Sequence, residues 1–407
     1  MWRRMLAVAV LTASACASGE EVDPFDFDLL SESVGTESPW EISGYVEFRN
    51  QYLTEQEDWL SNRFFGLMDV RWSRGRWRAL AIASAEYDPA TTDFRDPERS
   101  ELREGYLHYD GDSWDLTVGR IRVAWGTADG VSTIDRVNAI DLREPIANAR
   151  TASRRPSWLI RLEKSTAIGI FEAVWLPRGR DRKLPEFGSP WEPQSLNELR
   201  SLEAAGLIDL TIDDPHRPEG GLRYQHFGRG LDWGLAVYNG YTDVPASLDV
   251  EGSSVRLFPE RITTFNVNGA FGLKSSTLRA EIAYTPDFPE QGETSDLWQA
   301  VIGWDRTVLT NLYLNFQAFW NSTEVTPDQY GMTFAVTHPV LDDAATVGFR
   351  GQAARNDEFS AELFADFQWT DRINLLLRYF VFEGEPGTLL GDFAENDFVE
   401  CTLRFSF

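Results

Sequence analysis

The chain has 407 residues, with 38 Lys and Arg against 64 Asp and Glu, and a formal net charge of −26. It carries 15 Trp and 26 Phe, yet its mean hydropathy is −0.33. No stretch reaches the roughly 18 consecutive apolar residues that a spanning helix requires, which excludes a bundle of transmembrane helices. The acidic balance excludes nucleic acid as a partner, because phosphate attracts Lys and Arg. The aromatic content excludes a disordered acidic chain.

The N-terminus has the pattern of an exported protein. In residues 1–17 two arginines precede a short apolar run that ends in small residues, which predicts a cleaved secretory signal peptide. Acylation of Cys16 is an alternative. Residues 18–38 follow as an acidic segment that we expect in the periplasm. Cleavage would leave Cys401 without a partner, so an exported chain without disulfides points to stabilisation by a large closed sheet.

Residues 39–407 show the period of two that is typical of strands. The last strand is the clearest, because apolar residues alternate strictly with polar ones; its apolar positions are Val399, Cys401, Leu403, Phe405 and Phe407. A final aromatic residue resembles the terminal signal of bacterial outer-membrane barrels, so Phe405 and Phe407 form the predicted barrel-assembly signal. In a soluble sandwich the apolar face would meet a core, whereas in a membrane barrel it meets lipid.

Connection lengths favour the barrel. Short turns alternate with long connections along the whole chain, and the acidic residues around 286–295 are expected in one of the long connections. This alternation is expected when one rim has tight periplasmic turns and the other long extracellular loops. We therefore predict an all-β fold, a transmembrane antiparallel β-barrel of about 18 strands in the outer membrane. The count falls to 16 if the weak pair around 332–336 and 347–350 is absent. Ten Trp residues fall near strand ends, where interfacial girdles form.

The inward positions of the predicted strands carry charges of both signs. Rings of one sign would set ion selectivity, whereas a mixed lining indicates a polar, wet interior. An alginate-type polysaccharide exporter would require a strongly basic pore, which this mixed lining does not offer, so it is kept only as an alternative. The residues predicted to line the lumen are Arg49, Arg71, Arg103, Arg161, Arg223, Arg279, Glu281, Glu362, Asp366 and Arg378.

One long connection, residues 122–157, follows a recognisable pattern. Gly119-Arg120, Trp125-Gly126, Asn138 and Asp141 resemble the signature of the DUF1302-type outer-membrane proteins. The segments 104–107, 231–235 and 396–398 are similar to that family as well. The resemblance implies a large, porin-like barrel whose transport role is poorly defined.

The same connection is rich in arginine, which is unusual for an exposed loop. If it folds into the lumen, its arginines would constrict the pore and could bind an anionic group of a solute. The alternative is that they form ion pairs that only fix the loop. The candidates for the constriction or a solute site are Arg120, Arg122, Trp125, Arg136, Asp141, Arg143, Arg150, Arg154 and Arg155.

A second long connection, residues 177–220, is also expected in or over the mouth. Ser195 begins a capping box that predicts a short helix, and Gly206 is its expected end.

Motifs of enzymes are absent. The sequence has no Gly-x-Ser-x-Gly, no His-Glu-x-x-His and no phosphate-binding loop, and its four histidines lack metal-ligand spacing. We therefore predict no enzyme, no metal and no cofactor, and keep a surface enzyme only as an alternative.

The sequence thus predicts an outer-membrane channel or porin-like transporter for a small polar, anionic or amphipathic solute. A non-conducting structural or partner barrel of an envelope export system is the main alternative. Expected partners are outer-membrane lipid and lipopolysaccharide, the barrel-assembly machinery, and a periplasmic lipoprotein or inner-membrane pump.

Overall fold

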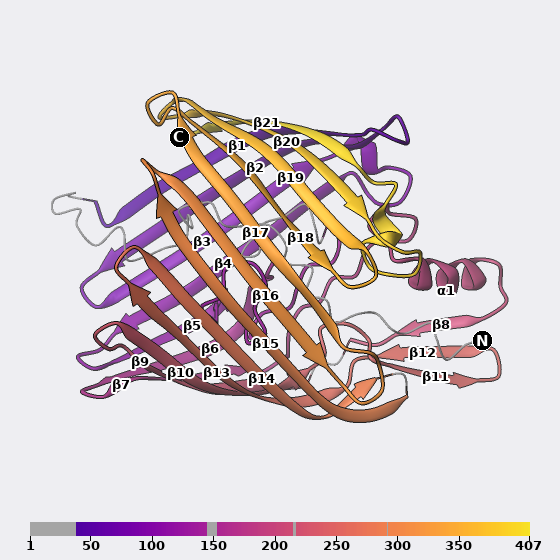
Figure 1. Ribbon diagram of the computed structural model, residues 1–407, viewed down its shortest axis with the longest axis horizontal. Coiled ribbons are helices and arrows are strands. Elements are labelled where there is room, and N and C mark those ends of the chain that lie inside the picture. The colour runs from indigo at the N-terminus through magenta and orange to yellow at the C-terminus, as the bar shows by residue number, and fades with distance from the viewer. Residues whose placement is uncertain (1–37, 145–152, 215–216, 291) are drawn as a thin grey trace.

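The computed structural model describes residues 38–144, 153–214, 217–290 and 292–407. Eighteen antiparallel strands pair in chain order, and the last pairs with the first, so the sheet closes into the predicted barrel (Figure 1). The strands are β1 (Trp40–Leu53), β2 (Asp58–Arg74), β3 (Trp77–Tyr87), β4 (Glu98–Asp110), β5 (Trp114–Ile121), β6 (Ser157–Thr166), β7 (Gly169–Leu176), β9 (Glu219–His226), β10 (Leu231–Tyr241), β13 (Arg261–Leu273), β14 (Ser276–Glu290), β15 (Glu293–Val308), β16 (Leu312–Ser322), β17 (Gln329–Val340), β18 (Ala345–Ala354), β19 (Glu358–Thr370), β20 (Ile373–Glu383) and β21 (Phe398–Ser406).

The weak strand pair of the sequence is present as β17 and β18, which settles the number at 18. The predicted signal peptide, the acidic segment up to residue 37, and Arg150 lie outside the described residues.

The side chains alternate across the barrel wall as the period of two requires. On β1, Ile42 and Val46 are 64% and 52% exposed on the outer face, whereas Glu47 is 4% exposed on the inner face. On β21, Val399, Leu403 and Phe405 face outward, and the buried Glu400 and Thr402 face inward. The outer wall is therefore apolar and suited to lipid, and the lumen is polar.

Short turns gather at one rim and long connections at the other (Figure 1). Two connections differ from the sequence prediction. The expected loop around 286–295 is mostly strand, because β14 runs to Glu290 and β15 starts at Glu293. The connection between β18 and β19 is a tight turn, with Asn356 and Asp357 in the left-handed region (φ 64° and 54°), which Asn and Asp tolerate. The alternation of short and long connections thus fails there.

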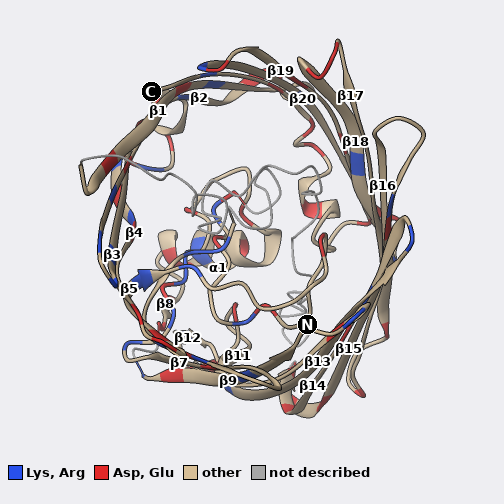
Figure 2. Ribbon diagram, turned by 90° about the vertical axis from the view of Figure 1, so that its left-hand side faces the viewer, with Lys and Arg blue, Asp and Glu red and all other residues tan. Residues whose placement is uncertain are grey.

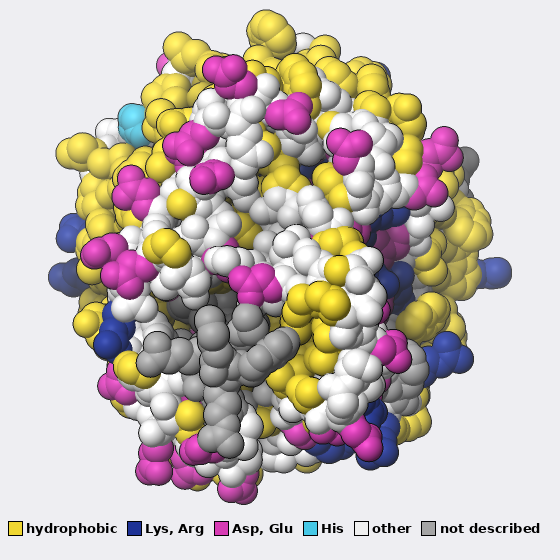
Figure 3. Space-filling model, turned by 90° about the vertical axis from the view of Figure 1, so that its right-hand side faces the viewer, with side chains coloured by type: hydrophobic (Ala, Val, Ile, Leu, Met, Phe, Trp, Pro, Cys, Tyr) yellow, Lys and Arg dark blue, Asp and Glu magenta, His cyan; other side chains and the backbone are white. Residues whose placement is uncertain are grey.

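The long-loop rim carries extra elements. A small sheet is formed by β8 (Asp209–Ile212), β11 (Ser247–Glu251) and β12 (Ser254–Phe258), beside helix α1 (Gln194–Ala204). Short 3₁₀ turns lie at η3 (Pro89–Thr91) and η4 (Gly391–Phe393). Figure 3 shows acidic side chains spread over this rim.

The predicted capping box is wrong. Pro193 occupies the N-cap of α1 and no side chain caps it, because the helix starts one residue before Ser195. The predicted end is confirmed: Gly206 takes φ +68°, and the Leu207 N–H donates to the Leu202 carbonyl at 2.9 Å. Among the described residues, no helix is long and apolar enough to span a membrane.

Candidate functional site

The connection between β5 and β6, residues 122–156, is called the inner loop here; 145–152 are not described. Figure 2 shows loop segments inside the ring of strands, and contacts of the inner loop with Glu172, Glu281 and Gln317 on the inner wall place it there. Trp125, Val137 and Asn138 are all fully buried there. A loop of this length would normally run over the surface, so specific contacts must hold it in the lumen.

The base of the inner loop is closed by Asn138. Its side-chain amide donates to the carbonyls of Ile121 and Arg155 at 3.2 and 2.8 Å, and its oxygen accepts from the Val123 N–H at 2.6 Å. One amide thus ties the two ends of the loop together. Trp125 follows, with its indole N–H donating to Glu172 of β7 at 3.3 Å. These contacts satisfy backbone groups that burial would otherwise leave unpaired.

The tip of the inner loop is held by Glu281 of β14, which is completely buried. Its carboxylate accepts from the backbone N–H groups of Thr127, Ala128 and Thr133 at 2.7, 2.8 and 3.0 Å, and from the Ser132 hydroxyl at 2.8 Å. Hydrogen bonds to a carboxylate are stronger than neutral ones. Among the described residues, no Lys or Arg forms an ion pair with this carboxylate. Backbone N–H groups and the Ser132 hydroxyl therefore stabilise its charge in place of a cation.

Two neighbours complete this contact. Gln317 of β16 accepts from the N–H groups of Gly130 and Val131 at 2.9 and 3.1 Å. Gly126 has φ +113°, and a Cβ there would lie 2.7 Å from a Glu281 oxygen, so only glycine fits. In the Trp-Gly pair of the sequence signature, Trp125 therefore supplies a buried indole, and Gly126 lets the backbone come close to Glu281.

The basic residues in the described part of the inner loop are paired. Arg154 lies 3.4 Å from Asp135, and Arg155 lies 3.1 Å from Asp141 and 2.7 Å from Glu101 of β4. Burial alone would raise the pKa of Asp141, but Arg143 and Arg155 outweigh it and hold that pKa below its usual value. The loop therefore carries its charges as buried pairs.

The inner loop also reaches the opposite wall. Glu144 pairs with Arg63 of β2, far around the barrel from Glu281 of β14. Arg136 donates to Gln299 of β15 at 2.5 Å. The loop thus spans the lumen between two walls, and its contacts divide the interior.

The connection between β7 and β9, residues 177–218, is called the outer loop. Arg180 is buried where the loop begins, 3.0 Å from Glu219 and 2.5 Å from Asp243, and it donates to the Arg136 carbonyl at 3.1 Å. The Leu142 N–H donates to the Lys183 carbonyl at 2.9 Å. The two loops are therefore joined.

The outer loop then crosses to the far side of the mouth. Trp191 is 3% exposed and packs edge-on against Phe382, Phe393 and Phe398, with ring centroids 5.8, 5.4 and 6.1 Å apart. These partners belong to β20, η4 and β21. The Asn396 amide fixes the same crossing by donating to the Pro190 carbonyl at 2.6 Å.

The lumen wall carries a ladder of alternating charges. Arg350, Glu362, Arg378 and Glu400, on β18 to β21, are linked by contacts of 2.6, 3.7 and 2.6 Å. The other predicted lining residues also face inward and have partners: Arg49 pairs with Glu47, Arg71 with Asp69, Arg161 and Arg223 with Glu172, Arg279 with Asp129, and Asp366 with Asn374.

Arg103 differs from these residues. It is partly exposed on the inner face of β4, and its guanidinium lies over the ring of Phe65, 5.4 Å from the centroid. Nowhere in the described ranges does a carboxylate come close enough to Arg103 to form an ion pair. It therefore offers a free positive charge to the lumen.

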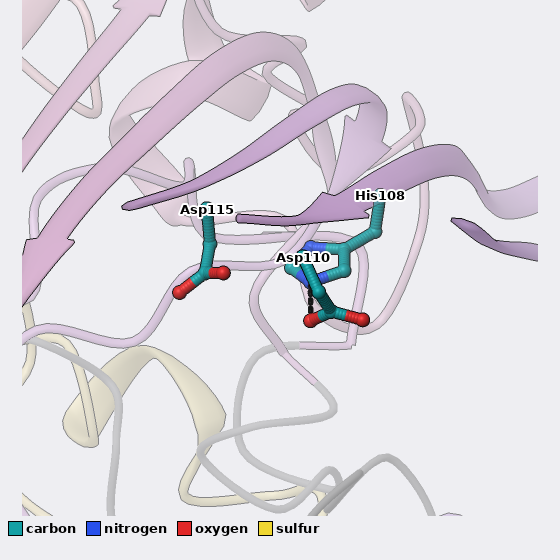
Figure 4. A group of neighbouring side chains, drawn as sticks. All are labelled: His108, Asp110 and Asp115. Carbon is teal, nitrogen blue, oxygen red and sulfur yellow. Dashed lines mark hydrogen bonds and ion pairs between the residues drawn. The ribbon is translucent and has the colours of Figure 1, made fainter. Parts of the chain in front are cut away.

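A group of possible metal ligands lies at the short-turn end of β4 and β5, although the sequence predicted none. Figure 4 shows His108, Asp110 and Asp115, whose ligand atoms lie within 4.8 Å of one another. Asp110 already accepts from Arg78 at 2.9 Å, and the His108 Nδ1 lies 2.9 Å from the Thr117 hydroxyl. Protein partners therefore explain the geometry, and we assign the group no ion.

The remaining predicted loop residues lie at the base of the inner loop. Arg120 donates to Glu101 at 2.7 Å, and Arg122 lies 4.0 Å from Glu104. Trp191, Gln317 and Arg180 were not predicted. For Arg180, the cluster of basic residues at 180–183 in the outer loop was a signal in the sequence that could have pointed to a buried ion pair.

One solved structure supports the fold, and two others show a weaker likeness. OccAB2 of Acinetobacter baumannii is similar with a TM-score of 0.55 at 9% identity, covering 90% of this chain and 97% of its own. A loop-deletion mutant of OmpT, an outer membrane protein of Vibrio cholerae, gives 0.46 at 8% identity, with 90% and 99% covered. A mutant porin of Rh. blastica gives 0.43 at 13%, with 90% and 100% covered.

None of the curated proteins matches the sequence. The family model for DUF1302, described as a protein of unknown function, matches residues 26–384. This match includes the signature that places the inner loop. The chain therefore belongs to the DUF1302 family.

Proposed function

We propose that this chain is an outer-membrane channel for small polar solutes, and that the inner loop forms its constriction. The observation that carries the proposal is the fixed position of that loop, held at its tip by Glu281 and at its other side by the pair of Glu144 with Arg63. A loop fixed across a polar lumen narrows the path and sets which solutes pass.

The lining supports a hydrophilic solute, with anions favoured. Most inward arginines are paired with carboxylates and contribute little net field. Arg103 is not, so its charge is available to a passing carboxylate or phosphate group. We therefore propose further that the channel transports anionic solutes.

Planar bilayer recording of the full chain tests the channel. The wild type should give discrete conductance steps. A variant in which residues 127–133 are replaced by a short Gly/Ser linker should give larger steps, because the tip no longer reaches Glu281. Proper folding of both proteins is checked by heat-modifiable migration in detergent gels. Absence of steps in both folded proteins would refute the channel.

A non-conducting structural barrel is the second candidate, and it is favoured by the path of the outer loop, which is fixed by Trp191 on the far side of the mouth. If the barrel is non-conducting, the variant with only the linker at 127–133 should give no conductance. A variant that has the linker and also lacks residues 184–206 should conduct. Co-purification with a periplasmic lipoprotein or an inner-membrane pump would support this candidate.

Location in the outer membrane belongs to the same proposal. It is supported by the apolar outer wall, the predicted signal peptide, and the outward-facing Phe405 and Phe407 at the C-terminus. The barrel-assembly machinery and lipopolysaccharide are the partners expected there.

A further inference from the structure

An apolar groove of about 400 Å³ lies on the wall formed by β6, β7, β9 and β10. Its most exposed members, Leu222, Trp175 and Leu162, are 60%, 50% and 46% exposed, and they belong to the outward face of the barrel. The groove is therefore open toward lipid and separate from the lumen.

Small residues create the groove. Gly220 lies between Trp175 and Asn239 in the strand register, and Ala173 lies between Leu162 and Leu222. A Cβ on Gly220 would lie 2.7 Å from a backbone oxygen, so this gap cannot be filled by mutation without strain. A row of small side chains between large ones leaves a channel that an acyl chain fits.

The end of the groove near the long-loop rim carries a positive charge. Arg261, at the start of β13, is exposed and donates to the side-chain oxygen of Asn239, which lines the groove, at 2.8 Å. It also donates to the Pro218 carbonyl at 3.2 Å and lies over the Tyr241 ring. These contacts hold the guanidinium beside the groove.

Arg261 keeps part of its binding capacity. A guanidinium has five N–H donors; each of its three nitrogens donates once, to Asn239 or Pro218, so about two N–H groups stay available for another acceptor. In the ranges that the structure describes, no carboxylate forms an ion pair with Arg261. Arg217, also exposed, directly precedes Pro218. In a chain of net charge −26, this unpaired outward charge is a suitable contact for phosphate.

We propose that this groove binds one lipid A moiety of lipopolysaccharide, with an acyl chain between Trp175 and Leu222 and a phosphate on Arg261. The proposal rests on the outer-membrane orientation given above, in which the long-loop rim faces the lipopolysaccharide leaflet. The lipid would hold β7, β9 and β10 together from outside, behind the wall that carries Glu172 and Glu219.

The test uses the delipidated full chain in detergent, titrated with lipid A and followed by native mass spectrometry. Arg261→Gln should weaken binding about tenfold, which corresponds to about 1.4 kcal/mol. Ala173→Phe should fill the groove and abolish binding. Ala318→Phe, at an exposed outward alanine on β16, is the matched control and should bind as the wild type does.

Equal weakening by Ala318→Phe would overturn the proposal, because the lipid would then be an ordinary part of the surrounding bilayer. Equal affinity for phosphatidylethanolamine, which also carries a phosphate group, in the same detergent would overturn the assignment of the groove to lipid A. If Ala173→Phe does not fold, the affinity of Arg261→Gln for lipid A still tests the proposal. Conductance in bilayers without lipid A should be the same for Arg261→Gln and the wild type, so failure of this site leaves the channel proposal standing.

Discussion

Replacing Glu281 by glutamine should release the tip of the inner loop. In the wild type each carboxylate oxygen accepts two hydrogen bonds, one oxygen from Thr127 and Ala128, the other from Ser132 and Thr133. The amide of Gln keeps one oxygen but places an NH₂ group where the second oxygen was. Two hydrogen bonds are therefore lost, and an amide donor faces other donors.

The size of the effect follows from these bonds. A hydrogen bond to a charged group contributes about 1.5–3 kcal/mol, so the loss of two amounts to about 3–6 kcal/mol at most. The bonds share one acceptor group and are not additive, and a released tip regains water. We therefore expect about 3 kcal/mol, which raises the ratio of released to docked tip about 100-fold.

Single-channel recording detects this change. Glu281→Gln should show larger or strongly fluctuating conductance, because the tip leaves the lumen for part of the time. Asp366→Asn is the control, since it removes an inward carboxylate of β19 whose described partner is Asn374 and not the inner loop. Unchanged conductance in folded Glu281→Gln, or the same change in the control, would refute the view that Glu281 holds the constriction.

Three further predictions concern other contacts. Arg103→Gln should lower the ratio of anion to cation permeability about tenfold, because a unit positive charge at about 6 Å in water favours an anion and disfavours a cation by about 0.7 kcal/mol each; removing both charges of a pair, in the double variant Arg71→Gln with Asp69→Asn, should leave the reversal potential in a KCl gradient nearly unaltered. Trp191→Ala should cost about 3–5 kcal/mol of packing and expose the outer loop to limited proteolysis; resistance equal to that of the wild type would contradict this. Burial alone would raise the pKa of Asp243, but Arg180 and neighbouring arginines hold it below the usual value, so its stabilising contacts should persist from pH 7 to 5 and weaken only below about pH 4; proteolysis of the outer loop that increases already at pH 6 would show that another group is responsible.

The barrel could be predicted from the sequence because its physical cause is local. A period of two assigns each side chain to a face, and Glu281, Arg103 and Arg378 lie on the inward face of their strands. The same pattern does not say what an inward side chain meets. The partners of Glu281 lie about 150 positions away in the chain, in a loop without periodicity.

Loop structure was the weak part of the prediction for a related reason. The turn between β18 and β19 is short because Asn356 and Asp357 accept left-handed conformations, which the strand pattern does not reveal. Acidic residues around 287–296 were expected in a loop, yet they continue β14 and β15 beyond the apolar wall. Trp191 was one aromatic residue in a polar loop, and its pocket is built from residues of β1, β2, β20, η4 with its preceding residue, and β21.

That pocket has a consequence for the order of assembly. Its members come from the first two strands and the last two, because Leu53 and Leu60 meet Phe380 and Phe398 there. It can form only after β21 has joined β1 and the ring is complete. The rings that Trp191 contacts belong to β20, η4 and β21, but its pocket is complete only when Leu53 and Leu60 of the first two strands adjoin them. We therefore expect full docking of the outer loop to follow closure of the barrel.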